Sequence, residues 1–321
     1  MRYVVLGVGA VGGVIAGRLF ESGHEVVLVA RGKHLEAIHS NGLTVASPSG
    51  TVTLQVPVVG HPVDAHLVPG DVVIIATKSH DTSGALDALC ATGCEELKIV
   101  CAQNGVRNEE TALRRFADVY GVCVMAPTAY SQPGLVEAYS SPVAGILDIG
   151  RYPSGTDEVS EAISKDLSAS TFVSVARPDI MRWKYRKLTS NIYNALEALL
   201  GPGGWPDELT TRIGREAKDV IAAAGIEMVS AAEDSERRGD LLSLAPVGGG
   251  RRGGGSSWQS LERGLGTIET DYLNGEIVLL GRLHGIPTPA NSLLQRMAAQ
   301  AARDRVAPGS TSAEDLLAML G

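Results

Sequence analysis

The chain has 321 residues, of which 44% are hydrophobic and 4% aromatic, and it contains 38 glycines. This length favours two domains, and the composition excludes a disordered chain, a collagen and a membrane-spanning bundle. The 28 Lys and Arg against 36 Asp and Glu give a net charge of −8, which argues against a general nucleic-acid binder.

The first half of the chain alternates short β-branched runs with helical patterns, which is typical of a parallel sheet with crossover helices. The predicted strands are residues 2–6, 25–30, 71–76, 98–102, 119–125 and 143–149. The apolar run from Tyr3 to Gly17 also imitates a secretory signal, but its five glycines make a poor helix and a second strand pattern follows. We therefore expect a cytoplasmic protein that does not enter a membrane.

The second half changes character after Arg177-Pro178, where apolar residues begin to recur at helical spacing. The predicted helices are residues 179–200, 207–224, 258–283 and 291–303. The fold class is therefore α/β, with an N-terminal Rossmann-type parallel-sheet domain over residues 1–177 and an all-α C-terminal domain over residues 178–321. The Gly- and Arg-rich stretch 248–255 is interpreted as a loop, and an RNA-binding arm is the alternative.

The four cysteines have neither CxxC spacing nor the density of a disulfide scaffold. They are Cys90, Cys94, Cys101 and Cys123. We interpret them as free thiols in a reducing compartment and expect no metal site.

A glycine motif follows the first predicted strand and opens a helix, which is the context that a dinucleotide-binding fingerprint requires. Its residues are Gly7, Val8, Gly9, Ala10, Val11 and Gly12. The first glycine permits a tight turn, the second lets the backbone approach a pyrophosphate, and the third lets helix and strand pack closely. A glycine-rich structural turn is the alternative.

The end of the second predicted strand indicates which dinucleotide binds. NAD enzymes place an acid there, whereas a 2′-phosphate requires an arginine. This chain has Arg31 and no acid, which favours NADP(H) over NAD; an ordinary solvated charge is the alternative. Lys78 and Asn104 follow the next two strands, where a lysine can meet a phosphate and an asparagine can bond a ribose and a substrate oxygen. Asn104-Gly105 is also a common turn, which is the structural alternative.

One predicted helix over residues 183–194 carries Lys187 and Asn191, which are four residues apart and share a face. A lysine that serves as general acid must be partly desolvated, so that its pKa falls toward the working pH. Lys184 competes for this role on spacing, and a solvated basic face is the structural alternative. Further along, Ser257 and Glu269 alone suggest only a helix cap and a dipole contact.

Together these motifs closely resemble the ketopantoate reductase (2-dehydropantoate 2-reductase) family, in chain order and over nearly the whole length. The closing Gly285-Ile286-Pro287-Thr288-Pro289-x-Asn291 is similar to that family too. The resemblance implies a Rossmann domain and a helical domain that together bind NADPH and a small-molecule 2-oxo acid. We expect neither nucleic acid nor a membrane as a partner. The expected assembly, if the chain associates, is a homodimer.

The resemblance also implies a role for each matched residue. Lys187 corresponds to the proton donor, and Asn191 and Ser257 correspond to substrate-binding residues. The expected cofactor contacts are Gly7 to Gly12, Arg31, Lys78, Asn104, Ala126 and Glu269, with Asn104 also touching substrate.

Three departures concern the far end of the substrate. The family's second asparagine is replaced by Ala195, and Asn194 stands one position earlier, about 20° from Lys187 on a continuous helix. A further substrate asparagine has no counterpart in 201–206, and Trp258-Gln259-Ser260 stands where the family has Met-x-Gln-Asp.

The expected reaction is therefore NADPH-dependent reduction of a 2-oxo acid to a 2-hydroxy acid, with 2-dehydropantoate, on the route to pantothenate, as the favoured substrate. A reductase of another keto compound and an NADP-sensing binding protein are the alternatives.

Overall fold

The computed structural model describes residues 1–320, which form two compact units. The first unit comprises residues 1–103, 107–183 and 231–252, and the second comprises 104–106, 184–230 and 253–320. The expected boundary at 177 falls close to the crossing at 183/184. The expected division was otherwise too simple, because residues 231–252 return to the first unit.

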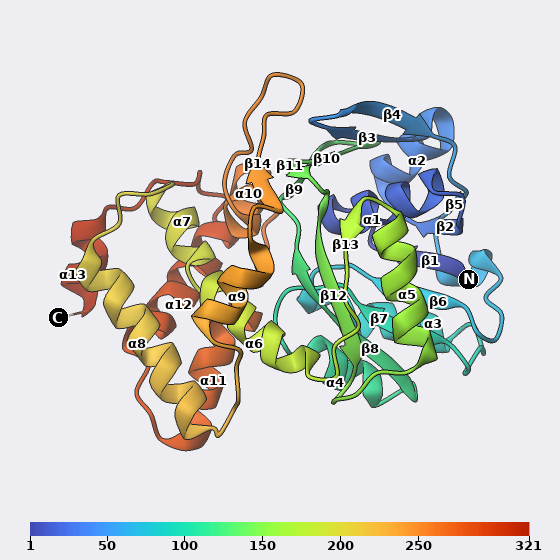
Figure 1. The fold of residues 1–321 in the computed structure, drawn as a ribbon. Coiled ribbons are helices and arrows are strands. Elements are labelled where there is room, and N and C mark those ends of the chain that lie inside the picture. The colour runs from blue at the N-terminus through green and yellow to red at the C-terminus, as the bar shows by residue number, and fades with distance from the viewer. Residues whose placement is uncertain (321) are drawn as a thin grey trace. The chain divides into compact units, whose positions relative to one another are not determined.

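The first unit is built on an eight-stranded sheet in the order β13-β12-β8-β7-β6-β1-β2-β5 (Figure 1). Its strands are β1 (Arg2–Leu6), β2 (Glu25–Val29), β5 (Val58–Val59), β6 (Val72–Ile75), β7 (Lys98–Cys101), β8 (Asp118–Met125), β12 (Gly145–Arg151) and β13 (Phe172–Val173). All neighbouring strands are parallel except β12 and β8. The chain continues from β1 to β2 on one side of β1 and later places β6 on the other side of β1. The strand order therefore reverses at β1, and doubly wound sheets bind ligands at the carboxyl end of such a reversal point.

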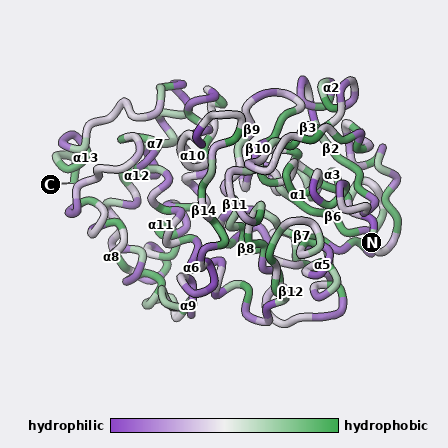
Figure 2. Tube along the Cα trace, turned by 45° about the horizontal axis from the view of Figure 1, so that its top comes forward, coloured by the Kyte–Doolittle hydropathy of each residue, from purple (hydrophilic) through white to green (hydrophobic). Residues whose placement is uncertain are grey.

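Both faces of this sheet are covered, which explains why its strands are continuous apolar runs (Figure 2). Tyr3 and Val5 pack into one core with α1 (Ala10–Glu21) and α5 (Glu158–Ala169). Val4 and Leu6 point the opposite way into a second core with α3 (Thr82–Cys90) and α4 (Asn108–Leu113). The six predicted strands are all present, and the predicted fold class is confirmed.

A second, four-stranded sheet was not predicted. Its order is β4-β3-β10-β9, formed by β3 (Leu43–Ser47), β4 (Gly50–Leu54), β9 (Thr128–Gln132) and β10 (Leu135–Ala138). β3 and β10 are parallel neighbours although some 90 residues separate them in the chain, as their register of Val45 with Val136 shows. Pairing over such a separation leaves no local sequence signal.

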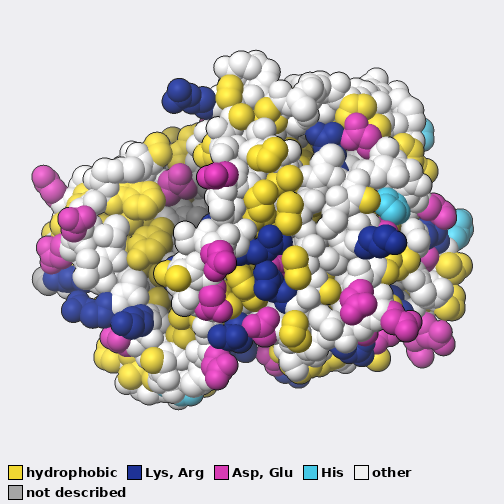
Figure 3. Space-filling view, in the orientation of Figure 1, with side chains coloured by type: hydrophobic (Ala, Val, Ile, Leu, Met, Phe, Trp, Pro, Cys, Tyr) yellow, Lys and Arg dark blue, Asp and Glu magenta, His cyan; other side chains and the backbone are white. Residues whose placement is uncertain are grey.

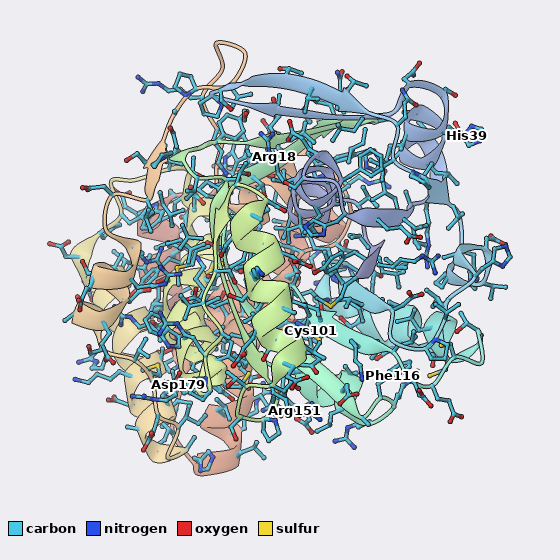
Figure 4. The ribbon with its side chains drawn as sticks, turned by 45° about the vertical axis from the view of Figure 1, so that its right-hand side comes forward. Arg18, His39, Cys101, Phe116, Arg151 and Asp179 are labelled. Atoms are coloured by element: carbon cyan, nitrogen blue, oxygen red, sulfur yellow. The ribbon has the colours of Figure 1, made fainter. Side chains whose placement is uncertain are left out.

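The amino end of the large sheet is fastened by ion pairs. Arg151, labelled in Figure 4, contacts Asp118 at 2.8 Å and Asp157 at 2.7 Å. Lys98 pairs with the same Asp118. Asp118 is the first residue of β8, so this cluster lies at the edge opposite the carboxyl ends of the parallel strands.

Residues 231–252 are held to the first unit by a buried carboxylate. Asp148 on β12 is fully buried and accepts from Arg177 Nε at 2.7 Å and from Arg237 Nε at 2.8 Å. Arg237 belongs to α9 (Ala231–Arg238), and the following strand β14 (Leu242–Leu244) pairs with β11 (Ser140–Pro142). The excursion therefore belongs to the first unit through both an ion pair and a strand ladder.

The second unit is helical. It contains most of α6 (Ile180–Asn191), together with α7 (Asn194–Leu200), α8 (Asp207–Ala223), α10 (Ser256–Glu262), the 3-10 turn η3 (Glu269–Tyr272), α11 (Asn274–His284), α12 (Pro289–Arg303) and α13 (Ala313–Leu320). Helices α8, α11 and α12 pack on one another through buried apolar side chains such as Ile213, Ile277 and Leu294. No helix among residues 1–320 is both long and apolar enough to cross a membrane.

Two predicted helices were wrong in their continuity. The helix expected over 258–283 ends at Glu262, because Gly264 takes a φ of +56° and closes a Schellman motif. In that motif Gly264 N donates to Leu261 O and Leu265 N donates to Ser260 O. The helix expected over 179–200 breaks between Asn191 and Asn194, where Tyr193 N donates to Ser190 O instead of continuing the regular ladder.

Candidate functional site

The glycine loop joins β1 to α1 at the carboxyl edge of the large sheet. Its geometry requires glycine at positions where a Cβ would clash with neighbouring backbone. Gly7 has a φ of +90°, and a Cβ there would lie 2.6 Å from Thr77 N. At Gly12 a Cβ would lie 2.2 Å from Gly7 O, so helix and loop can approach only at a glycine. At Gly9, by contrast, a Cβ would have no heavy atom within 4 Å, which leaves open space beside the N-cap of α1.

Other expected cofactor residues follow the carboxyl ends of neighbouring strands. Arg31 is the exposed N-cap of α2 (Gly32–Asn41), directly after β2. Lys78 follows β6 and precedes a short 3-10 turn, and Ala126 follows β8. Because parallel strands end at the same edge, these positions and the glycine loop belong to one edge of the sheet.

The loops after β6 and β7 are tied together by buried polar side chains. Gln103 Nε2 donates to Thr77 O at 2.9 Å and to Thr82 Oγ1 at 2.8 Å, and Thr82 Oγ1 donates to Asn108 Oδ1 at 2.8 Å. Among the described residues, the buried Thr77 Oγ1 has no hydrogen-bond partner. This hydroxyl, close to Gly7, suits a ligand at the edge, and the sequence pattern had not indicated it.

His34 is a second residue that the sequence interpretation missed. Its Nε2 contacts Val8 O at 2.7 Å, and Gly134 N donates to its Nδ1 at 2.9 Å. Burial lowers the pKa of His34 from 6.5, opposed by its bond to Val8 O. Its position three residues after Arg31 was visible in the sequence, but no local pattern links it to Val8.

In the second unit, α6 carries both candidate lysines. Lys184 is buried with 3% of its surface exposed, whereas Lys187 is partly buried. Lys184 is therefore no surface residue, and the alternative interpretation of this helix as a solvated basic face does not hold for it. Asn191 is 4% exposed, and within residues 1–320 its Oδ1 has no hydrogen-bond partner.

Asn194 does not continue the face of Lys187, as the sequence had suggested, because it opens the separate helix α7. Its Nδ2 donates to Ser256 Oγ at 3.4 Å, and Glu197 on the same helix accepts from Gly255 N at 2.7 Å. These contacts bring α7 against the start of α10, where Ser257 is the second residue.

Ser257 is not a helix cap. The N-cap of α10 is Gly255, and no side chain caps this helix. Ser257 is 2% exposed, and its Oγ has no hydrogen-bond partner in the part of the chain that the structure describes. A buried hydroxyl without a partner costs about 1–3 kcal/mol, which a ligand can recover.

The break between α6 and α7 is held by a buried polar network. Asn274 Nδ2 donates to Ile192 O at 2.9 Å and to Asn291 Oδ1 at 3.1 Å. Asn291 Nδ2 in turn donates to Ile213 O at 3.1 Å and to Glu216 Oε2 at 2.8 Å. Glu216 also accepts from the backbone N of Ala290 and Asn291 at the start of α12. No local pattern in the sequence predicts these contacts, which join residues as far as 82 positions apart.

Two expected cofactor residues belong to the second unit. Glu269 begins η3 and is 6% exposed. Asn104 lies in the segment 104–106, where a Cβ on Gly105 would lie 3.1 Å from Tyr272 O. The structure thus places the glycine loop, Arg31, Lys78 and Ala126 in one unit, and Asn104, Lys187, Asn191, Asn194, Ser257 and Glu269 in the other.

Acidic and basic side chains are interspersed on the face shown in Figure 3. In the Gly- and Arg-rich stretch, Val247 and Gly250 exchange two backbone bonds, and Arg252 Nε donates to Thr128 O at 3.3 Å. Gly253 and Gly254 contact the ring of Trp258 so closely that a Cβ would lie within 2.5 Å of it. These contacts fit the loop interpretation.

Known proteins match this chain over both units. The model of "Ketopantoate reductase PanE/ApbA" matches residues 3–153, and that of "Ketopantoate reductase PanE/ApbA C terminal" matches residues 179–302. The chain is 27% identical over 306 residues to the 2-dehydropantoate 2-reductase of Pyrococcus horikoshii, covering 92% of this chain and 95% of that protein. It is 28% identical to the Caulobacter vibrioides enzyme of the same name over 297 residues, covering 90% and 95%.

Solved structures agree. The PanE/ApbA family ketopantoate reductase from Ralstonia eutropha JMP134 has a TM-score of 0.80 and 27% identity, covering 95% of this chain and 99% of that one. A ternary structure of D-mandelate dehydrogenase with NADH and anilino(oxo)acetate also has a TM-score of 0.80, with the same coverage, and at 22% identity it shows the shared fold alone. The chain therefore belongs to the ketopantoate reductase family and is an oxidoreductase of the 2-dehydropantoate 2-reductase type.

Proposed function

We propose that this protein uses NADPH to reduce a 2-oxo acid to the 2-hydroxy acid, with 2-dehydropantoate as substrate and (R)-pantoate as product. The observation that carries the proposal is the pair of buried groups, Asn191 Oδ1 and Ser257 Oγ, that lack partners among residues 1–320. They belong to the same helical unit as Lys187.

The chemistry of these groups fits such a substrate. An amide oxygen accepts a hydrogen bond, so Asn191 Oδ1 suits a hydroxyl of the substrate or of the 2-hydroxy product. A serine hydroxyl can donate to the carboxylate of a 2-oxo acid. We assign both to substrate binding, together with Asn194 and Asn104.

Lys187 is the proposed general acid. It lies four residues before Asn191 on α6, so both side chains project from the same face of the helix. Its ammonium group would donate a hydrogen bond to the carbonyl oxygen, stabilise the negative charge that develops there and finally transfer the proton. Lys184 is the competing residue, since it shares that face and is more deeply buried.

The first unit would hold the dinucleotide, which when bound supplies the hydride. The open space beside Gly9 and the buried Thr77 hydroxyl fit a pyrophosphate at the N-terminus of α1. Arg31 would pair with the 2′-phosphate, which favours NADPH over NADH. Lys78 and Ala126 from this unit, and Glu269 from the second, complete the proposed cofactor set.

A different 2-oxo acid is the second candidate, and the segment 201–206 favours it. Trp205 provides the only polar side-chain atom there, and its Nε1 donates to Gly201 O at 2.8 Å. The ring also stacks on Tyr193, with centroids 6.5 Å apart. The one side-chain donor of this segment is therefore already bonded within the protein. None is left for a terminal hydroxyl of the substrate.

The deciding experiment is NADPH consumption over a panel that includes 2-dehydropantoate and its deoxy analogue, 2-oxo-3,3-dimethylbutanoate. A site that bonds the terminal hydroxyl rejects the analogue by about 10⁴–10⁵ in kcat/KM, whereas an apolar pocket separates substrates by about 10–200-fold per methylene. Asn194→Ala should erase much of the larger gap while barely affecting the analogue. Equal kcat/KM values would remove the 2-dehydropantoate assignment and leave the 2-oxo acid reductase in place.

A further inference from the structure

His34 connects three parts of the first unit that are distant in the chain. It lies in the first turn of α2, and its ring contacts the Val8 carbonyl of the glycine loop and the Gly134 amide of the turn between β9 and β10. The edge of its ring also packs against Tyr130 on β9, with centroids 4.8 Å apart.

These partners fix the protonation of the ring. A backbone N–H can only donate, so Nδ1 of His34 must be bare to accept from Gly134. A carbonyl can only accept, so Nε2 must carry the hydrogen and donate it to Val8 O. The bound form is therefore the neutral Nε2–H tautomer, and the lowered pKa of His34, caused mainly by burial, agrees with it.

The bond to Val8 also sets the direction of the next amide. The Val8 carbonyl and the Gly9 N–H belong to one planar trans peptide and point in opposite directions. Holding the carbonyl against His34 therefore aims the Gly9 N–H away from the ring. Gly9 is the N-cap of α1, and a Cβ built on it would meet no heavy atom within 4 Å, which leaves room on that side for a pyrophosphate.

We propose that His34 is a positioning residue that presets the Gly9 N–H for the cofactor pyrophosphate. This inference rests on the proposed dinucleotide function and deepens it. Its bond to Gly134 orients the ring, and its bond to Val8 does the positioning.

Two substitutions separate these bonds. His34→Gln places an amide N–H near the position of Nε2 and can still donate to Val8 O. His34→Asn places an amide oxygen near the position of Nδ1, so it keeps the acceptor for Gly134 and loses the donor to Val8 O. Thermal unfolding shows that each variant is folded before binding is measured.

The readout is the dissociation constant for NADPH, measured by fluorescence titration without substrate. His34→Asn should weaken binding about tenfold, the equivalent of roughly one hydrogen bond, and His34→Gln should stay within about threefold of the unchanged protein. In turnover the KM for NADPH should rise in His34→Asn, while kcat and the KM for the 2-oxo acid stay unchanged.

Two results would overturn the inference: unchanged NADPH binding in His34→Asn, or equal weakening in both variants, which would indicate a purely structural connection between α2 and the second sheet. Failure of the unsubstituted protein to bind NADPH would instead refute the proposed function, so the two failures are distinguishable.

Discussion

The two units hold their candidate residues in opposite ways. The glycine loop of the first unit is shaped mainly by close backbone contacts at Gly7 and Gly12, where no Cβ would fit, and His34 adds one side-chain bond to Val8 O. The helical unit instead fixes the break that follows Asn191 through side chains from distant parts of the chain, as the bond from Asn274 to Ile192 O shows. The glycine spacing that marks the first site is therefore local in the chain, whereas the site with buried amides depends on the packing of the whole unit.

The largest expected effect tests the helical side of this comparison. Lys187→Ala should lower kcat by about 10²–10⁴, the usual range for losing a general acid. Lys184→Met is the matched control, because it removes a charge from the same helix and preserves most of the buried volume. It should stay within a few-fold in kcat, and a reversed outcome would assign the proton transfer to Lys184.

Substitution of Arg31 tests whether the first unit distinguishes NADPH from NADH through the charge of this one residue. Arg31→Asp should lower the ratio of kcat/KM for NADPH over NADH by about 10- to 100-fold, since hydrogen bonds to charged groups contribute about 1.5–3 kcal/mol. Lys33→Asp makes the same change of charge two residues later on an exposed position. If both variants shift the ratio equally, the preference comes from general potential and not from Arg31.

Asn274 tests the distributed network. Asn274→Ala should lower the free energy of unfolding by about 1–3 kcal/mol, because it leaves Ile192 O and Asn291 Oδ1 without their donor. Asn291→Ala and the double variant complete a double-mutant cycle. Urea unfolding of the four proteins then gives the coupling energy between Asn274 and Asn291. Strict additivity of the two single effects would show that the amides do not act as a unit.

The glycine loop offers a pair of variants with opposite signatures. Gly12→Ala forces a methyl against Gly7 O and should lower the free energy of unfolding by about 1–3 kcal/mol. Gly9→Ala meets open space and should leave unfolding within about 0.5 kcal/mol while weakening NADPH binding. Urea unfolding and NADPH titration measure both, and equal destabilisation would mean that the loop is constrained at every glycine.

His34 gives the smallest effect, a dependence of stability on pH. Because burial lowers its folded pKa below 6.5, the unfolded chain binds more protons just below that value. The contribution of neutral His34 to the free energy of unfolding is therefore complete above pH 6.5. It is lost as the pH falls through the pKa that His34 has in the folded protein.

The groups around the ring do not reverse this sign. The other charged or titratable residues of its own helix and N-cap are exposed, and they are Arg31, Lys33, Glu36 and His39. The ring's contacts from other elements are Val8 O, Gly134 N and the Tyr130 ring. Urea unfolding from pH 8 to 5 should show a steeper loss than in His34→Gln, and parallel curves would contradict the assignment.

The same contrast explains what the sequence could reveal. The parallel strands and the glycine loop were predictable because strand patterns and glycine spacing are local. The second sheet was missed because β3 and β10 pair across a long stretch of chain. The break after Asn191 was missed because the apolar periodicity continues through it, whereas Asn274, which donates to Ile192 O, lies 82 residues further along the chain. The proposed roles of Asn191 and Ser257 come from family resemblance, and their burial could be seen only in three dimensions.

The return of residues 231–252 to the first unit has a consequence for modularity. The chain passes between the units after 103, 106, 183, 230 and 252, so no single cut releases either one intact. A fragment beginning at residue 178 would carry Arg237 without its carboxylate and β14 without its neighbouring strand. Recombination with another nucleotide-binding unit would therefore have to transplant α9 and β14 together with the sheet.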